Sequence, residues 1–132
     1  MTRRKQRENI FRILFKLEFN SVDEMEEQIG YSIDGLDGLG DEDRDYIVAK
    51  TRKIIDCVGE LDKTISEVSS RWNIERIGKA ELAILRLAVY EMKYDEDVPF
   101  RVAINEAVEL AKIYCNDDAK SFVNALLAKV DE

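Results

Sequence analysis

The chain has 132 residues, of which 45% are hydrophobic, with one proline, two cysteines and no histidine. This length fits one domain with a substantial core. Two isolated cysteines without histidine exclude a disulfide framework and the common zinc sites, and they favour a reducing cytoplasm. The apolar run behind the basic N-terminus is interrupted by Arg12, Lys16 and Glu18, and no later run reaches membrane-spanning length, so we expect a soluble, unprocessed protein.

The net charge is −8, but it is unevenly distributed. Residues 1–16 contain one acidic residue, Glu8, and six basic ones, a net charge of +5; the basic residues are Arg3, Arg4, Lys5, Arg7, Arg12 and Lys16. The remaining residues hold 14 basic and 27 acidic groups, a net charge of −13. The sequence therefore places a basic arm on an acidic body.

The first half of the chain is expected to form three helices. The first has a broad apolar face made of Ile10, Phe11, Ile13, Leu14, Phe15 and Leu17. Ser21 is expected to cap a short second helix that reaches about Ile29, and residues 31–40 are expected to form a loop. Asp41 is expected to cap a third helix that runs to Val68, with a bend or division at Gly59.

Trp72 and Ile74 are expected to lie in the connection to a fourth helix, at about 78–94. This helix is apolar on nearly all sides, so it should be the most buried. Pro99 marks the start of a fifth helix, and Asn116 or Asp117 is expected to cap a last one. The last helix carries the apolar residues Phe122, Val123, Leu126, Leu127 and Val130. No segment alternates like a half-buried strand, so we predict an all-α single domain, 1–132.

Catalytic chemistry is not indicated. Without histidine the usual general base at neutral pH is absent, and no nucleophile motif is present. Cys115 precedes a helix, where the dipole could lower its pKa, but a packing role is favoured. The loop with Asp34 and Asp37 matches neither a P-loop nor an EF-hand. We therefore expect no catalytic residue, metal site, cofactor or small-molecule substrate.

Two features break local rules. Positive charge in the first turns of a helix opposes its dipole, at a cost of roughly 0.3 to 1 kcal/mol per exposed group. Arg3 and Arg7 lie along the line of Ile10, so the first helix is expected to extend past its core and display them; the alternative is a frayed, solvated terminus. Glu81 falls on the apolar side of its helix, where it is either a partly exposed first-turn acid or a functional carboxylate.

Four segments resemble one family in the same order along the chain. They are RRKQRENIFRILF (3–15), RIGKAELAILRLAVYE (76–91), VAINEAVELAK (102–112) and SFVNALL (121–127). Together they resemble the NusB family of bacterial transcription antitermination factors. The resemblance implies about six or seven helices in two small bundles, at about 1–70 and 75–132, with a division near residues 70–78.

The resemblance also implies function. It implies a factor that binds boxA RNA of ribosomal RNA leader transcripts as a heterodimer with the ribosomal protein NusE, within the RNA polymerase antitermination complex. Family members open with an arginine-rich, RNA-binding helix, which matches Arg3, Arg4, Lys5 and Arg7 here. Positions that face NusE match Phe15, Glu81, Asp118 and Phe122, although residue type alone would favour Phe122 as core.

The chain departs from the family pattern at three positions. Phe15 replaces a common tyrosine, while Ser121 and Ala125 replace a frequent lysine and glycine; Lys120 can supply the displaced charge.

Two other functions stay open. The same helical module occurs in some ribosomal RNA cytosine methyltransferases, which would require a second polypeptide for the cofactor-binding domain. The other is a protein-only helical adaptor with merely solubilising arginines.

Overall fold

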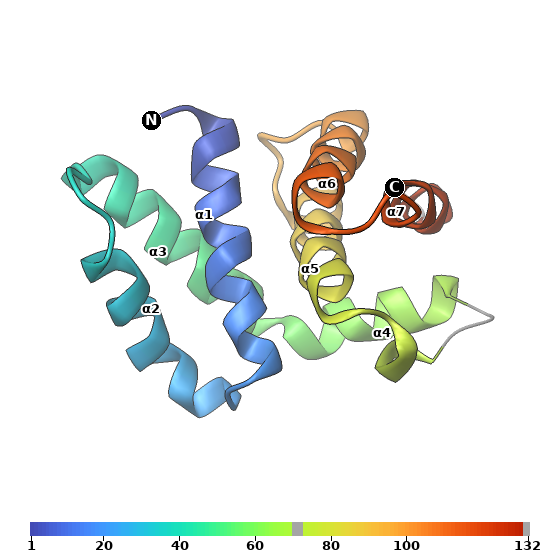
Figure 1. Cartoon of the computed structure of the whole chain (residues 1–132), viewed down its shortest axis with the longest axis horizontal. Coiled ribbons are helices and arrows are strands. Elements are labelled where there is room, and N and C mark those ends of the chain that lie inside the picture. Colours follow the sequence, from blue (N-terminus) through green and yellow to red (C-terminus); the bar gives the residue numbers. More distant parts are fainter. Residues whose placement is uncertain (70–72, 131–132) are drawn as a thin grey trace. The chain divides into compact units, whose positions relative to one another are not determined.

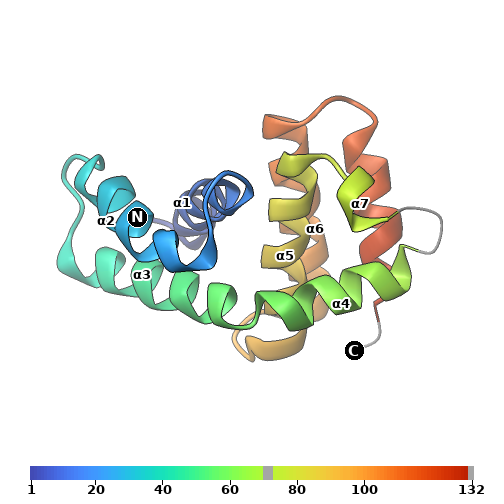
Figure 2. The same cartoon turned by 90° about the horizontal axis from the view of Figure 1, so that it is seen from below.

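The fold is all-helical, as predicted. The computed structural model describes residues 1–69 and 73–130, and these contain seven α-helices, three short 3₁₀ helices and no strand. Their packing divides the chain into two compact units, Met1–Asp56 and Cys57–Glu132. Figures 1 and 2 show the helices of each unit from two directions.

The division between the units falls earlier than the expected 70–78. The predicted long third helix is two helices, α3 (Asp41–Asp56) and α4 (Val58–Val68). The break is at Cys57, whose backbone leaves the helical region with φ −114° and ψ 20°, whereas Gly59 lies inside α4. Because α4 packs against α5 and α7, it belongs to the second unit. The predicted position of Trp72 lies outside the described residues.

The first unit is built around α1 (Arg3–Phe15), which packs against α3 and α2 (Met25–Asp34). Two 3₁₀ helices, η1 (Lys16–Glu18) and η2 (Val22–Glu24), connect α1 to α2. Thr2 caps α1, because its hydroxyl accepts a hydrogen bond of 3.0 Å from the Lys5 N–H. The helices bury large apolar side chains, including Ile10, Leu14, Met25, Ile29, Ile47 and Ile54.

The start of the second predicted helix is confirmed, but its end is not. Ser21 and Glu24 form a reciprocal capping box, with the Ser21 N–H donating to Glu24 over 2.8 Å. The capped 3₁₀ helix η2 leads into α2, which begins at Met25 and continues to Asp34 rather than stopping near Ile29. A single glycine such as Gly30 costs a helix only about 1 kcal/mol, which neighbouring contacts can offset. The loop is correspondingly shorter, and Gly38 adopts φ +68° within it.

The second unit is centred on α5 (Lys79–Tyr94), as predicted. Figure 1 shows α5 beside α6 (Phe100–Tyr114), and it also contacts α4 and α7 (Ala119–Leu127). A third 3₁₀ helix, η3 (Ile74–Arg76), precedes α5. α5 buries apolar side chains on most sides: Leu82, Ala83, Ile84, Leu85, Leu87, Ala88 and Val89. Burial all around a helix is what its nearly uninterrupted apolar sequence predicts.

The predicted helix starts in this unit are mostly confirmed. Pro99 immediately precedes α6, and the Asn116 side chain accepts a hydrogen bond of 3.1 Å from the Ala119 N–H at the start of α7. The last helix is shorter than expected, because it ends at Leu127. Val130 is nevertheless buried in the turn that follows. At the start of α3, Asp41 is the first helical residue rather than the cap.

In the part of the chain that the structure describes, no helix combines the length and the apolar character needed to span a bilayer.

Candidate functional site

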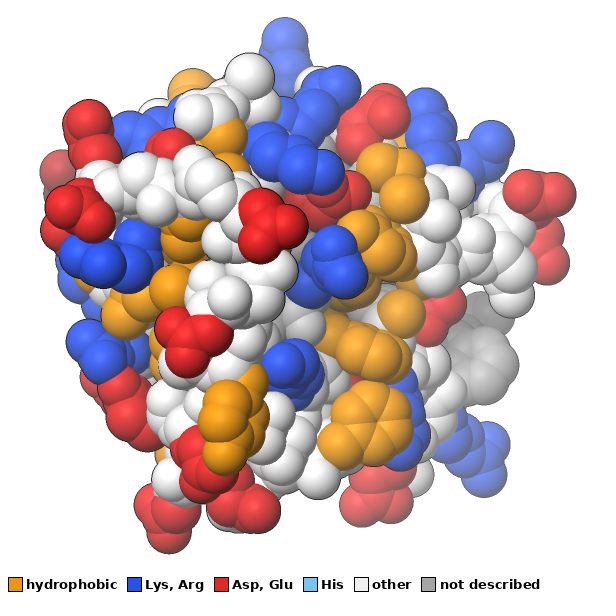
Figure 3. Space-filling view, turned by 60° about the vertical axis from the view of Figure 1, so that its left-hand side comes forward, with side chains coloured by type: hydrophobic (Ala, Val, Ile, Leu, Met, Phe, Trp, Pro, Cys, Tyr) orange, Lys and Arg blue, Asp and Glu red, His pale blue; other side chains and the backbone are white. Residues whose placement is uncertain are grey.

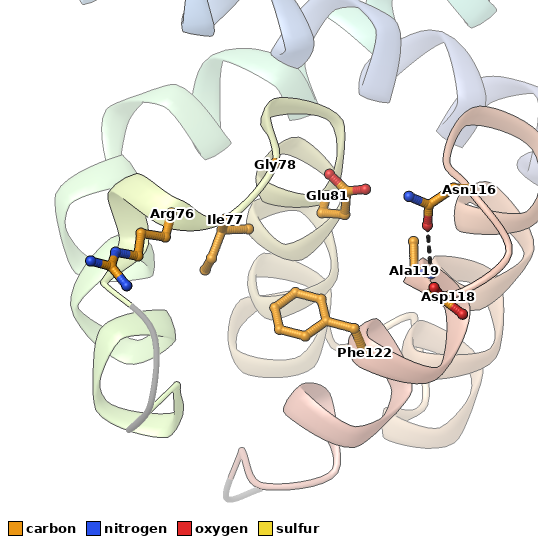
Figure 4. Close-up of a pocket in the computed structure, with 8 residues that line it drawn as sticks. All are labelled: Arg76, Ile77, Gly78, Glu81, Asn116, Asp118, Ala119 and Phe122. Atoms are coloured by element: carbon orange, nitrogen blue, oxygen red, sulfur yellow. Dashed lines mark hydrogen bonds between the residues drawn. The ribbon is translucent and has the colours of Figure 1, made fainter.

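The second unit contains a pocket between the starts of α5 and α7. Its volume is about 250 Å³, and Figure 4 shows the residues around it. They come from two segments that are distant in sequence: Arg76, Ile77, Gly78 and Glu81 from the first, and Asn116, Asp118, Ala119 and Phe122 from the second. Three of the four residues that the resemblance assigned to partner binding therefore surround one cavity.

The two carboxylates of the pocket lie at helix N-termini. Glu81 is in the first turn of α5, and Asp118 immediately precedes α7. The exposed N–H groups of a helix start favour negative charge there, so neither acid needs a neutralising partner to be tolerated. Glu81 is half-buried and Asp118 is exposed. The local fold thus allows two negative groups to remain available at the rim.

The apolar part of the pocket is formed mainly by Ile77 and Phe122. Ile77 is buried, whereas Phe122 is half-buried and faces the pocket, as Figure 4 shows. Val123 and Leu127, on the same helix, are completely buried. Residue type alone favoured Phe122 as a core residue, but the helix instead places its ring at the edge of the core. Aromatic residues are enriched at protein interfaces, so a partly exposed ring at this pocket fits a protein-binding surface.

Cys115 borders Glu81 from the end of α6. Burial raises the pKa of the Cys115 thiol to about 12, and the Glu81 carboxylate adds to this through its negative charge and a hydrogen bond from the thiol. The sequence left open that the dipole of the following helix lowers the pKa of the Cys115 thiol. In the structure this pKa is raised instead, so Cys115 has the properties of an inert packing residue rather than a nucleophile.

Phe15, the fourth predicted partner residue, belongs to the first unit and does not line the pocket. It is half-buried near the end of α1. Its ring packs edge-on against Phe19, with 5.3 Å between ring centres, and Phe19 is 61% exposed. Phe15 is thus part of a small, partly exposed aromatic group.

The basic arm is helical from Arg3 onward, so it is not a frayed terminus. Arg4 and Lys5 are exposed, and Lys5 forms an ion pair of 2.7 Å with Glu8. Arg7 is only 9% exposed. The expectation that α1 displays Arg7 on a protruding end is therefore wrong, because this side chain is on the buried side of the helix.

Arg3 is held in place by its neighbours. Its guanidinium carbon lies 4.0 Å from the centre of the Tyr46 ring, and its Nη1 donates to Gln6 over 2.7 Å. Gln6 in turn donates to Asp43 over 2.8 Å, and the Met1 amino group is 3.1 Å from the same carboxylate. These bonds from the amino group and Gln6 hold the pKa of Asp43 below its usual value. Asp43 therefore offsets the unfavourable positive charge at the start of α1.

Figure 3 shows how the charges are distributed over one face of the molecule. Lys and Arg side chains are interspersed there with Asp and Glu side chains and with hydrophobic groups. Of the four predicted RNA-binding residues, Arg4 and Lys5 are exposed, Arg3 is exposed and stacked on Tyr46, and Arg7 is buried.

Sequence reasoning missed five residues of the pocket: Arg76, Ile77, Gly78, Asn116 and Ala119. Two of these residues could have been found from the predicted helix starts, because Gly78 and Asn116 both lie at positions where a helix was expected to begin. The sequence did not reveal that these two starts come together. That proximity depends on how α5, α6 and α7 pack.

The chain is similar to known proteins over nearly its whole length. The transcription antitermination protein NusB of Agathobacter rectalis is 50% identical over 129 residues, covering 98% of both chains. The protein of the same name from Lachnoclostridium phytofermentans is 46% identical over 130 residues, again covering 98% of both. These identities extend over both structural units.

Solved structures agree with the fold. NusB of T. maritima superimposes with a TM-score of 0.83 at 29% identity, covering 98% of this chain and 90% of that one. A structure described as antitermination factors NusB and NusE in complex with dsRNA gives a TM-score of 0.85 at 21% identity, covering 98% and 97%. The model of the NusB family matches residues 4–132. The chain is therefore a member of the NusB family.

Proposed function

We propose that this chain is a transcription antitermination factor that binds boxA-type RNA as a heterodimer with NusE. The observation that carries the proposal is the gathering of Glu81, Asp118 and Phe122 around one pocket of the second unit. Membership of the NusB family supports it, as does the similarity to a NusB that was solved together with NusE and RNA. The function is one of binding, and none of its steps requires catalysis.

The pocket has the size and chemistry of a site for a protein side chain. Its volume of about 250 Å³ is smaller than the roughly 300 to 1,000 Å³ of small-molecule sites. An apolar wall with carboxylates at the rim fits a long cationic side chain, whose methylene groups would pack on Phe122 while its charge meets Glu81 and Asp118. A basic ribosomal protein offers such side chains, and electrostatic complementarity would favour this partner over acidic ones.

RNA binding is assigned to the start of α1. Exposed basic residues such as Arg4 and Lys5 would contact phosphates, which supply affinity without sequence preference. Recognition of particular bases requires single-stranded nucleotides read by further side chains or by the partner. The buried Arg7 would support the arm structurally rather than contact RNA.

RNA binding is tested by titrating a boxA-type single strand at several salt concentrations. If about three phosphates are neutralised, log affinity should fall with log salt with a slope near −2, at about −0.7 per phosphate. Arg4→Glu/Lys5→Glu should weaken binding strongly while helical circular dichroism is retained. The matched control is Lys63→Glu/Lys129→Glu, which changes the net charge equally at exposed positions outside the arm. Equal losses in both double variants would contradict the assignment to the arm.

Partner binding is tested by calorimetric titration of NusE. Glu81→Lys should abolish the complex, since like charges brought together at an interface cost several kcal/mol. Glu67→Lys makes the same charge change at an exposed position of α4 away from the pocket, and it should bind normally. A folded Glu81→Lys protein with wild-type NusE affinity would show that the pocket is not the partner site.

A further inference from the structure

Glu81 and Glu24 occupy the same position in their helices but behave differently. Glu24 follows its N-cap, Ser21, by three residues, and its carboxylate accepts a 2.8 Å hydrogen bond from the Ser21 N–H. Glu81 follows its own N-cap, Gly78, by the same spacing. In the described part of the chain no hydrogen bond from the Gly78 N–H to Glu81 is present. Glu24 caps its helix, whereas Glu81 accepts a hydrogen bond from the Cys115 thiol and lines the pocket.

The difference is explained by the space beside Gly78. A Cβ atom placed on Gly78 would lie 1.9 Å from Oε2 of Glu81 and 2.9 Å from its carboxyl carbon. The carboxylate thus occupies the volume that any other side chain at residue 78 would need, and Figure 4 shows the two residues adjacent at the start of α5. The backbone does not require glycine there, since φ −57° and ψ 149° are accessible to every residue.

We infer that Gly78 is a positioning residue, which keeps the Glu81 carboxylate directed to the partner pocket and out of a capping box. This inference rests on the proposed function, in which Glu81 contacts NusE. Serine at position 78 would displace the carboxylate from its present place. It would also create the Ser-x-x-Glu pattern of Ser21 and Glu24, in which the glutamate turns back to the backbone N–H of the cap.

The informative variant is therefore Gly78→Ser. Serine is a better N-cap than glycine, so the variant should melt at the same temperature or higher. Its affinity for NusE should nevertheless fall about tenfold or more, as expected when a hydrogen bond to a charged group is lost. Stability and affinity would then change in opposite directions, which general structural damage does not produce. Gly59→Ala is the control, because a Cβ on Gly59 meets no atom within 4 Å.

A double-mutant cycle separates this inference from the function on which it rests. NusE is titrated calorimetrically into wild type, Gly78→Ser, Glu81→Ala and the double variant, and each is melted. If Gly78 acts through Glu81, Gly78→Ser should change affinity by less than about twofold in the Glu81→Ala background.

Each other result has a defined meaning. Equal losses in both backgrounds would mean that the serine itself obstructs the partner, and the inference would be wrong. Wild-type affinity or a lowered melting temperature in Gly78→Ser, with affinity lost in Glu81→Ala, would reject the positioning role while the proposed function stands. Normal binding by Glu81→Ala would reject the partner site and the inference together.

Discussion

Arg3 stacks on Tyr46, with the guanidinium carbon 4.0 Å from the ring centre, so the first basic residue of the arm is anchored to α3. The contact joins the start of α1 to the start of α3 within the first unit. Together with Asp43, it explains how an arginine can be tolerated in a first turn that contains no acidic residue. The arm is therefore an ordered part of the unit before any RNA is bound.

The Arg3 and Tyr46 contact should be measurable as a coupling energy. In a double-mutant cycle of Arg3→Ala and Tyr46→Leu, followed by chemical denaturation, we expect a coupling of about 0.5 to 1 kcal/mol. Tyr46→Phe keeps the aromatic face and should retain most of it. Additive effects of the two substitutions would mean that the stack does not contribute to stability in solution.

Phe122 and Leu127 lie on the same helix and should separate binding from stability. Leu127 is completely buried, so Leu127→Ala should lower the free energy of unfolding by about 2 to 5 kcal/mol. Phe122 is half-buried at the pocket, so Phe122→Ala should weaken NusE binding with a smaller loss of stability. Denaturant unfolding and calorimetry of both variants test this. A loss of stability in Phe122→Ala as large as that in Leu127→Ala would identify the ring as core.

Two ion pairs of the second unit should differ in their contribution to stability. Arg86 donates to both carboxylate oxygens of Asp62, over 2.8 and 2.9 Å, and its side chain is only 11% exposed. Asp62→Ala leaves this charge without its bidentate partner, and we expect a loss of roughly 1 to 3 kcal/mol in denaturant unfolding.

The comparison is Glu109→Ala, which removes an exposed ion pair with Lys112. Both side chains of this pair are more than 40% exposed, at 43% and 49%. A surface pair at such spacing contributes about 0.5 kcal/mol or less. Similar losses in Asp62→Ala and Glu109→Ala would show that the bidentate geometry adds nothing.

The reactivity of Cys115 should report on the charge of Glu81. Because burial and then Glu81 raise the thiol pKa to about 12, the wild-type thiol should react slowly with iodoacetamide even at pH 9. Glu81→Gln removes the negative charge, so the pKa should fall and alkylation should become faster. The measurement uses a Cys57→Ser background, so that Cys115 is the thiol observed. An unchanged or slower rate in Glu81→Gln would contradict the contact.

The same shift has a consequence for stability against pH. The thiol pKa is above its ordinary value of 9.0, so the folded state binds this proton more tightly than the unfolded state does. The stability that the protonated thiol contributes to the folded state is complete below about pH 9, and it is lost as the pH rises toward about 12. Cys115→Val should therefore reduce the steepness of alkaline unfolding.

How far the sequence predicts this protein can be judged from particular residues. Local patterns located most helix starts, because Ser21, Pro99 and Asn116 act on the backbone within a few residues. The continuous apolar surface of the fourth predicted helix identified α5 as central. Family resemblance then selected Glu81, Asp118 and Phe122, which residue type alone did not distinguish from first-turn acids and core.

Other features depend on contacts between distant segments, which local patterns do not encode. The break falls at Cys57 rather than at Gly59, and α2 continues through Gly30, so the weak local preference of glycine decided neither boundary. Arg7 is in the basic arm by sequence but is buried in the structure. The sequence by itself determined the helical fold and its family. Only the tertiary structure decided that the starts of α5 and α7 share a pocket, and that the Glu81 carboxylate fills the space left by Gly78.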